Sequence, residues 1–180
     1  MKVLVFCDIH ASKKFVDLLI KKSKNVDLLI CAGDTSFFGQ GLEAVIRDLK
    51  KTGKKMLIIP GTHESDSDVA KLVRKYNYLI DLHGKVVYID GICFVGYGNL
   101  GFSKIERKFE QLILSLKKKI PLGSKLIFVT HGPAYGTKLD KLPVHGHVGC
   151  KSFNKFINEV KPFYHFSGHL HENFNLKDKL

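Results

Sequence analysis

Short apolar segments alternate with amphipathic segments along this chain, and this alternation limits the available folds more than any other feature. Seven segments rich in Val, Ile, Leu and Phe are typical of strands: Lys2–Cys7, Val26–Cys31, Lys55–Ile59, Lys85–Asp90, Ile92–Gly96, Lys125–Thr130 and Tyr164–Ser167. Five segments have helical spacing: Lys13–Lys22, Leu42–Lys51, Asp66–Tyr76, Ser103–Lys119 and Cys150–Val160. Such an alternation predicts an α/β fold.

Local signals at the ends of these segments refine the prediction. Asp66 and Ser103 are of the residue types that cap helix N-termini, so we expect a helix to begin at each. The dipeptide Asp90-Gly91 favours positive φ and predicts a hairpin between the two central strands.

Length and composition are consistent with one domain, 1–180, because 180 residues with 44% hydrophobic content are enough for a packed core. The four cysteines contain no CxxC pair, so we expect free thiols in a reducing compartment. The first apolar segment turns polar at Asp8, and no run approaches the ~20 apolar residues of a membrane span. We therefore expect a cytoplasmic protein with no membrane partner.

The net charge of +12 comes from 29 Lys and Arg against 17 Asp and Glu. An excess of this size favours anionic partners such as nucleic acid or phosphate esters. Only Arg47, Arg74 and Arg107 are arginine, the residue suited to planar bidentate contacts with phosphate. A lysine-rich solvated surface is therefore the simpler explanation, and the charge alone names no partner.

Five polar clusters follow predicted strands directly: Asp8-Ile9-His10, Gly33-Asp34, Gly61-Thr62-His63-Glu64, His131-Gly132 and Gly168-His169-Leu170-His171. Ligands of open α/β sheets bind at the carboxyl ends of the strands, so we expect these clusters to converge on one site. A lone histidine would more simply be structural. Five clusters in equivalent positions are not explained in that way.

The side chains in these clusters are those that bind divalent transition metals. Residues two apart, such as Asp8 and His10, leave an extended backbone on the same side and can reach one ion. Carboxylates combined with imidazoles suit Mn, Fe, Ni or Zn better than Ca. Asp34 stands alone on its turn and is the natural bridging ligand for two ions, which together bind a phosphoryl group and activate water.

In this order the clusters resemble the blocks of the calcineurin-like metallophosphoesterase family, D-x-H, G-D, G-N-H-[DE], H and G-H-x-H. The resemblance extends from residue 2 to about residue 175. It implies a four-layer α-β-β-α sandwich of two mixed sheets flanked by helices, with a dinuclear metal centre. It also implies hydrolysis of a phosphoric ester by attack of a hydroxide that bridges the ions.

Carried over by position, the resemblance assigns two sets of metal ligands, Asp8, His10, Asp34 and His171 for one ion and Asp34, Thr62, His131 and His169 for the other. His63 and Asp34 are the implied catalytic residues, with His63 protonating the leaving oxygen or stabilising the transition state. The implied cofactors are two divalent transition metal ions, with Mn²⁺ expected first and Fe, Ni or Zn as alternatives.

The chain departs from the family pattern at two places. The family has Asn where this chain has Thr62, and a hydroxyl is a shorter and weaker ligand than an amide oxygen, so we expect the second ion to bind loosely or through water. The chain also ends at Leu180, nine residues after His171, where family members usually continue with further strands. One sheet is then expected to lack its C-terminal strands, and the uncovered edge favours a homodimer.

The substrate is the least determined part of the prediction. The long Arg-poor loop His131–Gly149 and the lack of an inserted capping domain favour a small phosphodiester over a phosphomonoester, with nucleic acid as a further candidate substrate. The rival interpretation is a weakly active or inactive member that binds nucleic acid or a protein. Thr62, the short C-terminus and the net charge favour that rival, whereas the intact ligand set and His63 favour the enzyme.

Three other features leave alternatives open. Phe37 and Phe38, in the loop after Asp34, either pack inward or face the substrate. The segment 96–101 matches GxGxxG, but the acidic residue that a dinucleotide site requires is missing, so a turn near the site is the better interpretation. His145 and His147 are either additional metal or phosphate contacts or merely exposed.

Overall fold

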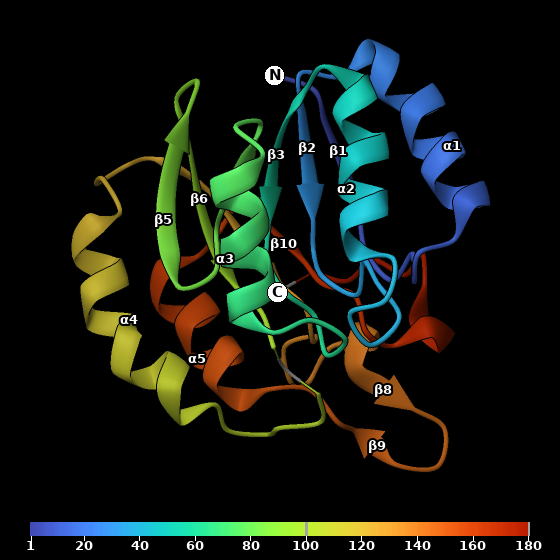
Figure 1. Cartoon of the computed structure of the whole chain (residues 1–180). Coiled ribbons are helices and arrows are strands. Elements are labelled where there is room, and N and C mark those ends of the chain that lie inside the picture. The colour runs from blue at the N-terminus through green and yellow to red at the C-terminus, as the bar shows by residue number, and fades with distance from the viewer. Residues whose placement is uncertain (100, 180) are drawn as a thin grey trace.

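The computed structural model describes residues 1–99 and 101–179, and it places two four-stranded sheets face to face (Figure 1). The first sheet has the order β1-β2-β3-β4, formed by β1 Val3–Phe6, β2 Leu28–Cys31, β3 Lys55–Ile58 and β4 Leu79–Asp81. The second has the order β10-β7-β6-β5, formed by β5 Lys85–Ile89, β6 Ile92–Tyr97, β7 Lys125–Thr130 and β10 Tyr164–Phe166.

Helices cover the outer face of each sheet (Figure 1). The first sheet is covered by α1 Lys13–Lys22, α2 Leu42–Leu49 and α3 Asp66–Lys75, and the second by α4 Arg107–Lys119 and α5 Lys151–Val160. Four short 3₁₀ segments lie at Ser23–Asn25, Lys50–Thr52, Lys138–Asp140 and His171–Asn173. The four-layer α-β-β-α architecture is thereby confirmed. The first sheet is wholly parallel, whereas the second is mixed through its antiparallel hairpin β5–β6.

Three hydrophobic clusters hold the four layers together, because the central strands carry apolar side chains on both faces. In β2, Leu28 points between the sheets and Leu29 toward the helices. In β7, Ile127 points between the sheets and Phe128 packs against α4 and α5. The period-2 alternation of strand side chains thus divides one apolar run between two cores.

The structure differs from the sequence prediction mainly at short elements and helix caps. It contains three strands that were not predicted, β4 and the two-residue strands β8 Lys141–Leu142 and β9 Gly146–His147. Such short segments carry too few residues for a recognisable period. The predicted N-cap at Asp66 is wrong, because Ser65 caps α3 through a capping box with Asp68. The one at Ser103 is also wrong, because α4 begins later, after its N-cap Glu106.

Two local predictions are confirmed. The hairpin between β5 and β6 turns at Asp90 and Gly91, both with positive φ of +48° and +78°. All four cysteines are free thiols. No helix in the described part of the chain combines the length and apolar content that a membrane crossing needs.

The loop 131–149 is ordered around one buried carboxylate. Asp140 accepts hydrogen bonds from the backbone N–H groups of Gly136, Thr137 and Gly149, and its Oδ1 lies 2.8 Å from Nδ1 of His147. These bonds join the segment before the 3₁₀ turn 138–140 and the end of the β8–β9 hairpin to Asp140. His147 is therefore used to build the loop.

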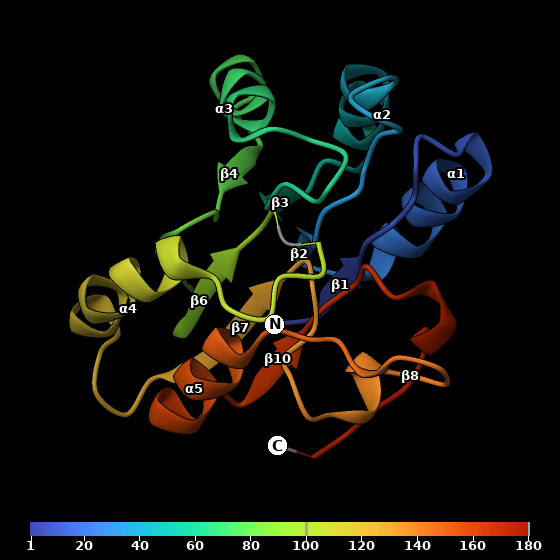
Figure 2. The same cartoon turned by 90° about the horizontal axis from the view of Figure 1, so that it is seen from below.

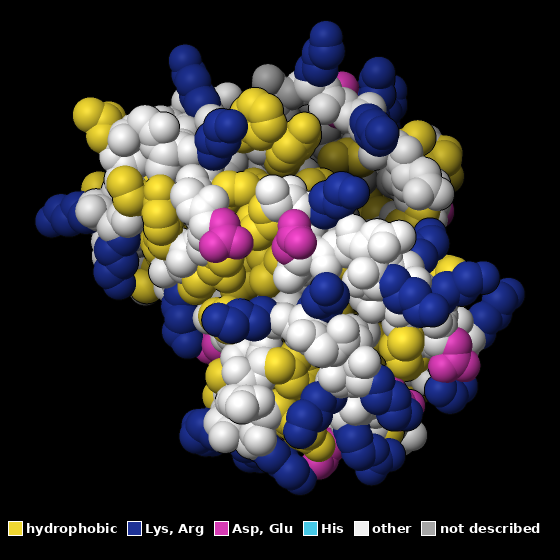
Figure 3. Space-filling view, turned by 90° about the horizontal axis from the view of Figure 1, so that it is seen from above, with side chains coloured by type: hydrophobic (Ala, Val, Ile, Leu, Met, Phe, Trp, Pro, Cys, Tyr) yellow, Lys and Arg dark blue, Asp and Glu magenta, His cyan; other side chains and the backbone are white. Residues whose placement is uncertain are grey.

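The face at the amino ends of the parallel strands carries many scattered Lys and Arg side chains with apolar side chains between them (Figure 3). Met1, Tyr88 and Leu122 line a groove there, together with the turn between β5 and β6. This face is opposite the end of the molecule where the polar clusters lie. The lysines on it therefore fit the interpretation of a solvated basic surface.

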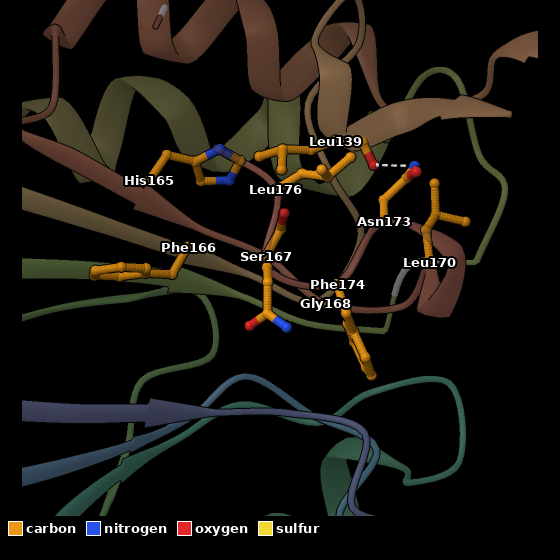
Figure 4. Close-up of a pocket in the computed structure, with 10 residues that line it drawn as sticks. Leu139, His165, Phe166, Ser167, Gly168, Leu170, Asn173, Phe174 and Leu176 are labelled. Atoms are coloured by element: carbon orange, nitrogen blue, oxygen red, sulfur yellow. Dashed lines mark hydrogen bonds between the residues drawn. The ribbon is translucent and has the colours of Figure 1, made fainter. Parts of the chain in front are cut away.

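A small pocket lies behind β10, between that strand and the C-terminal segment (Figure 4). His165 lines it and stacks on Phe128, with ring centroids 5.1 Å apart. Thr130 Oγ1 donates its proton to the carbonyl of Gly132, so His165 Nε2–H donates to Thr130 Oγ1 over 2.8 Å. Burial lowers the pKa of His165 to about 4, and the ring is neutral in the folded protein at neutral pH.

The depressed pKa of His165 predicts an acid-sensitive fold. An unfolded histidine binds a proton near pH 6.5, whereas folded His165 does so only near pH 4, so its contribution is present above pH 6.5 and is lost as the pH falls toward 4. The free energy of unfolding, measured with urea on the metal-free protein, should fall between pH 7 and pH 5 by about 1–2 kcal/mol less in His165→Gln than in the wild type. Glutamine keeps a hydrogen bond to Thr130 but does not titrate. The same pH slope in both proteins would contradict this.

Candidate metal centre

The five polar clusters meet at the end of the molecule where β1, β2, β3, β7 and β10 terminate (Figure 2). Potential ligand atoms form two groups, each with all atoms within 4.8 Å of one another: Asp8, His10 and His171, and Asp34, His131 and His169. His10 and Asp34 form a third group with His63, which links the first two. The structure therefore brings the acidic and imidazole side chains together in the two halves that the sequence predicted, and their assignment as ligands stays a prediction.

The backbone at several of these residues adopts the left-handed conformation that non-glycine residues rarely use. The φ angles are +55° at Asp8, +44° at His10, +49° at Asp34 and +71° at His169. Hydrogen bonds between loops hold this conformation, for example from Asp8 N–H to Gly33 O over 3.0 Å and from His10 N–H to Asp34 O over 3.1 Å. Strain concentrated in this way is typical of functional sites, where it aims side chains at a shared point.

Two glycines are required because backbone passes very close to the carboxylates. A Cβ atom at Gly61 would lie 2.1 Å from Asp34 Oδ1, and one at Gly168 would lie 2.4 Å from Asp8 Oδ2. Any side chain at either position would push a carboxylate out of the centre. The glycines in the Gly61-Thr62-His63-Glu64 and Gly168-His169-Leu170-His171 clusters are thus part of the site geometry.

Backbone carbonyls determine the tautomers of His10 and His131. A carbonyl can only accept, so Nδ1–H of His10 donates to Ser36 O over 3.2 Å and Nδ1–H of His131 donates to Ala32 O over 2.9 Å. In the neutral rings, Nε2 then carries the lone pair, and it points into the centre. This is the arrangement of a metal-ligating histidine, whose other nitrogen is held by an outer hydrogen bond.

His63 has the opposite tautomer. The backbone N–H of Phe38 donates to His63 Nδ1 over 3.0 Å, so Nδ1 is an acceptor and the proton of the neutral ring is on Nε2. His63 Nε2 lies 3.9 Å from Asp34 Oδ2, at the edge of the centre. A neutral His63 therefore presents a proton to the site, where His10 and His131 present lone pairs.

Several nitrogens at the centre lack the partners that buried polar atoms normally have. Nε2 of His169 is buried without a hydrogen-bond partner, and Nε2 of His131, which forms no regular hydrogen bond, lies 3.2 Å from Asp34 Oδ2. The Nε2 atoms of His10 and His171 lie 3.4 Å apart. Because buried polar atoms are almost always satisfied, this pattern fits a cation bound among them, and the mixed carboxylate and imidazole donors fit a divalent transition metal.

The electrostatics of the centre also favour a cation. Burial alone would raise the pKa of Asp34, but contacts with His131 and His63 outweigh it and hold this pKa well below its usual range. Burial opposes a charge on His131, yet the nearby Asp34 carboxylate raises the pKa of its imidazole. Burial lowers the pKa of His169, with a further contribution from His131. The buried Asp34 carboxylate thus favours positive charge beside it.

Thr62 lies at the centre but directs its hydroxyl proton toward Asp34. Its Oγ1 donates to Asp34 Oδ2 over 3.1 Å and lies 3.3 Å from Oδ1. The N–H of His63 donates to Asp34 Oδ1 over 2.9 Å. Thr62 therefore orients the predicted bridging carboxylate in this structure, and its part as a weak ligand of the second ion stays a prediction.

Glu64 organises the site in a way that sequence reasoning missed. Its carboxylate is buried and accepts from the N–H groups of Asp34 over 3.0 Å, Gly61 over 2.9 Å and Ser36 over 2.7 Å, and from the Ser36 hydroxyl over 2.6 Å. It thereby joins the loop after β2 to the loop after β3. The only sequence signal was an acidic residue within a metal-binding cluster, which more often indicates a ligand or a partner of the neighbouring His63.

The structure bears on the remaining sequence alternatives, and it places His145 on the exposed surface. Phe37 and Phe38 do not pack inward, because they are 54% and 71% exposed. In the glycine-rich segment 96–101, of which Leu100 lies outside the described residues, Gly98 packs against Pro60 with no room for a Cβ. These contacts explain the glycine as a close approach of two loops.

Comparison with known proteins agrees with the geometry. The sequence profile described as calcineurin-like phosphoesterase matches residues 1–173. The chain belongs to the calcineurin-like phosphoesterase family, whose members are metal-dependent phosphoesterases.

Relatives and structural neighbours give the extent of this similarity. An uncharacterized protein of Methanocaldococcus jannaschii is 30% identical over 188 residues, which cover 96% of this chain and 81% of that protein. A UPF0046 protein of Caenorhabditis elegans is also 30% identical, over 96% of this chain but only 64% of its own length. A purple acid phosphatase from yellow lupin seeds has the same fold, with a TM-score of 0.66 at 11% identity, covering 95% of this chain and 38% of that one.

Replacing Thr62 tests whether the second half of the centre is weakened in this chain. We expect Thr62→Asn to tighten the second metal ion by roughly tenfold and to raise turnover, because an amide oxygen reaches further and binds a cation better than a hydroxyl. Thr62→Val, which keeps the shape but removes the oxygen, should loosen the same ion. Metal content after dialysis and Mn²⁺ titration measure both effects, and unchanged affinity and rate in Thr62→Asn would refute the prediction.

Proposed function

We propose that this protein is a dinuclear-metal phosphodiesterase of the cytoplasm, with Mn²⁺ as the expected metal. The observation that carries the proposal is the opposed tautomers around one carboxylate. His10 and His131 present lone pairs to the centre, whereas His63 presents a proton from the same end of the molecule. A protein that only bound a partner would have no physical need for this combination.

The residues divide the work of phosphoester hydrolysis. Two bound divalent cations would supply a hydroxide held between them as the nucleophile and would neutralise charge on the phosphoryl group. Asp8, His10 and His171 would hold one cation, and His131, His169 and Thr62 the other, with Asp34 shared by both. His63 would donate its Nε2 proton to the oxygen of the departing alcohol, as a general acid.

The charge around the centre supports a diester more than a monoester. A monoester dianion is best bound with added cationic groups, whereas a diester has a single negative charge. Within the described ranges, neither Asp8 nor Asp34 forms an ion pair with Lys or Arg, and their partners are histidines. His171, with 52% of its side chain exposed, leaves one side of the centre open to a second ester group.

Hydrolysis assays test this function directly. With added Mn²⁺ we expect turnover of bis-p-nitrophenyl phosphate to exceed that of p-nitrophenyl phosphate, and a chelator should abolish both. No metal-dependent turnover of either ester with Mn²⁺, Fe²⁺, Ni²⁺ or Zn²⁺ would refute the enzyme. If nucleic-acid affinity then fell steeply with salt and no hydrolysis occurred, the protein would instead be a binding module.

The role of His63 is tested by the leaving group. A general acid matters most when the departing oxygen is strongly basic, so His63→Gln should lower kcat for alkyl phosphodiesters by about 10²–10⁴-fold. The loss should be much smaller for p-nitrophenyl esters, whose leaving group needs little protonation. Equal losses for both substrates would show that His63 acts in another way, and unchanged Mn²⁺ content would confirm that the centre is intact.

A further inference from the structure

We propose that Phe38, together with Phe37, forms an aromatic platform beside His63 that selects phosphate esters whose leaving group carries a planar ring. This inference rests on the proposed function, since it names the substrate class of that same site. The shared chemistry is a flat apolar ring on the departing alcohol, and its two sources are simple aryl alcohols and nucleosides.

The first observation is that two adjacent aromatic side chains are exposed to solvent. Phe37 and Phe38 are 54% and 71% exposed although they lie on a loop whose neighbours Thr35 and Ser36 are fully buried. The two rings contact each other in a T-shaped arrangement with centroids 5.0 Å apart. Adjacent exposed aromatic rings on an ordered loop form an apolar surface that remains open to a ligand.

The second observation is the conformation that presents these rings. Phe38 has a φ of +50°, in the left-handed region that bulky residues rarely adopt. Reciprocal backbone hydrogen bonds between Phe37 and Gln40, of 3.2 and 3.0 Å, and a bond from Gly39 N–H to Ser36 Oγ over 3.1 Å hold the turn. The fold therefore maintains a strained turn whose result is to project Phe38 outward.

The third observation places the platform on the leaving-group side. Phe38 lies against His63 with ring centroids 4.2 Å apart and a tilt of 40°, and Phe37 lies 5.5 Å from the same ring. The backbone N–H of Phe38 also sets the tautomer of His63. Because His63 Nε2 donates to the departing oxygen in the proposed mechanism, whatever is attached to that oxygen is brought next to these rings.

Aromatic side chains at the other site histidines are consistent with this surface. Phe102, which is 63% exposed, lies 4.9 Å from the ring of His169, and Phe174, which is 47% exposed, stacks on His171 at 5.1 Å. The centre is thus bordered by apolar rings where a general anion site would carry cationic side chains. Stacking on such rings favours planar groups whatever their hydrogen-bonding pattern.

Binding of non-hydrolysable diester analogues tests the platform without relying on turnover. In benzyl(methyl)phosphinate, carbon–phosphorus bonds replace both ester bonds of a phosphodiester and the single negative charge is kept, and ethyl(methyl)phosphinate is its alkyl counterpart. By calorimetry on the Mn²⁺-loaded protein, we expect the benzyl ligand to bind more tightly than the ethyl ligand, and Phe38→Leu to reduce the affinity for the benzyl ligand by roughly 5- to 50-fold. Affinity for the ethyl ligand should stay unchanged, and Phe38→Tyr, which keeps a ring, should resemble the wild type.

The matched control is Phe163→Leu, the same substitution at an exposed phenylalanine before the amino end of β10, which should bind both phosphinates like the wild type. A further arm uses a methylphosphinate joined to adenosine through a methylene group, and it separates nucleoside from simple aryl recognition. Equal affinity of the wild type for benzyl and ethyl ligands, no binding of either, or equal weakening of both in Phe38→Leu would overturn the platform. Failure of the phosphodiesterase itself would appear separately, as absence of hydrolysis by the wild type.

Discussion

The geometry of the centre depends on the buried carboxylate of Asp34. It accepts hydrogen bonds from Thr62 and from the N–H of His63, and it lies beside Nε2 of His131. A buried negative charge is unfavourable unless cationic or hydrogen-bonding groups surround it. The left-handed turn at Asp34, the glycine at position 61 and the clamp formed by Glu64 all serve to keep this charge in place. In the proposed enzyme, bound cations balance it.

The loops around this carboxylate contact the site histidines through different backbone groups, either a carbonyl or an N–H. This difference connects the fold to the chemistry of the site. At His10 and His131, Nδ1 donates to a backbone carbonyl, so the lone pair on Nε2 points toward the centre. At His63, Nδ1 accepts from a backbone N–H, so the proton on Nε2 points toward the centre. The choice is made by backbone groups that lie 25 or more residues away in the sequence. It explains how similar histidines at neighbouring strand ends present a lone pair in one case and a proton in another, and the loop carrying Phe38 makes this choice for His63.

Much of the architecture followed from local patterns because the strands are buried on both faces and the helices have one apolar face. The order of strands and helices and the convergence of the clusters were predicted for that reason. The N-caps at Asp66 and Ser103 were wrong because Ser65 and Glu106 compete for the same role nearby, and spacing does not separate such neighbours. The β8–β9 hairpin was missed because it depends on Asp140, whose partners are up to nine residues away.

The sequence by itself determined the fold class, the family and the convergence of the polar clusters, because strand ends and residue types are local properties. Only the tertiary structure decided which nitrogen of each histidine faces the centre, that Thr62 and Glu64 orient the loops, and that Phe37 and Phe38 are exposed beside His63. These features arise from contacts between segments that lie about 25 to 30 residues apart or more. Such contacts have no local signature, because each depends on where another loop places a single backbone N–H or carbonyl.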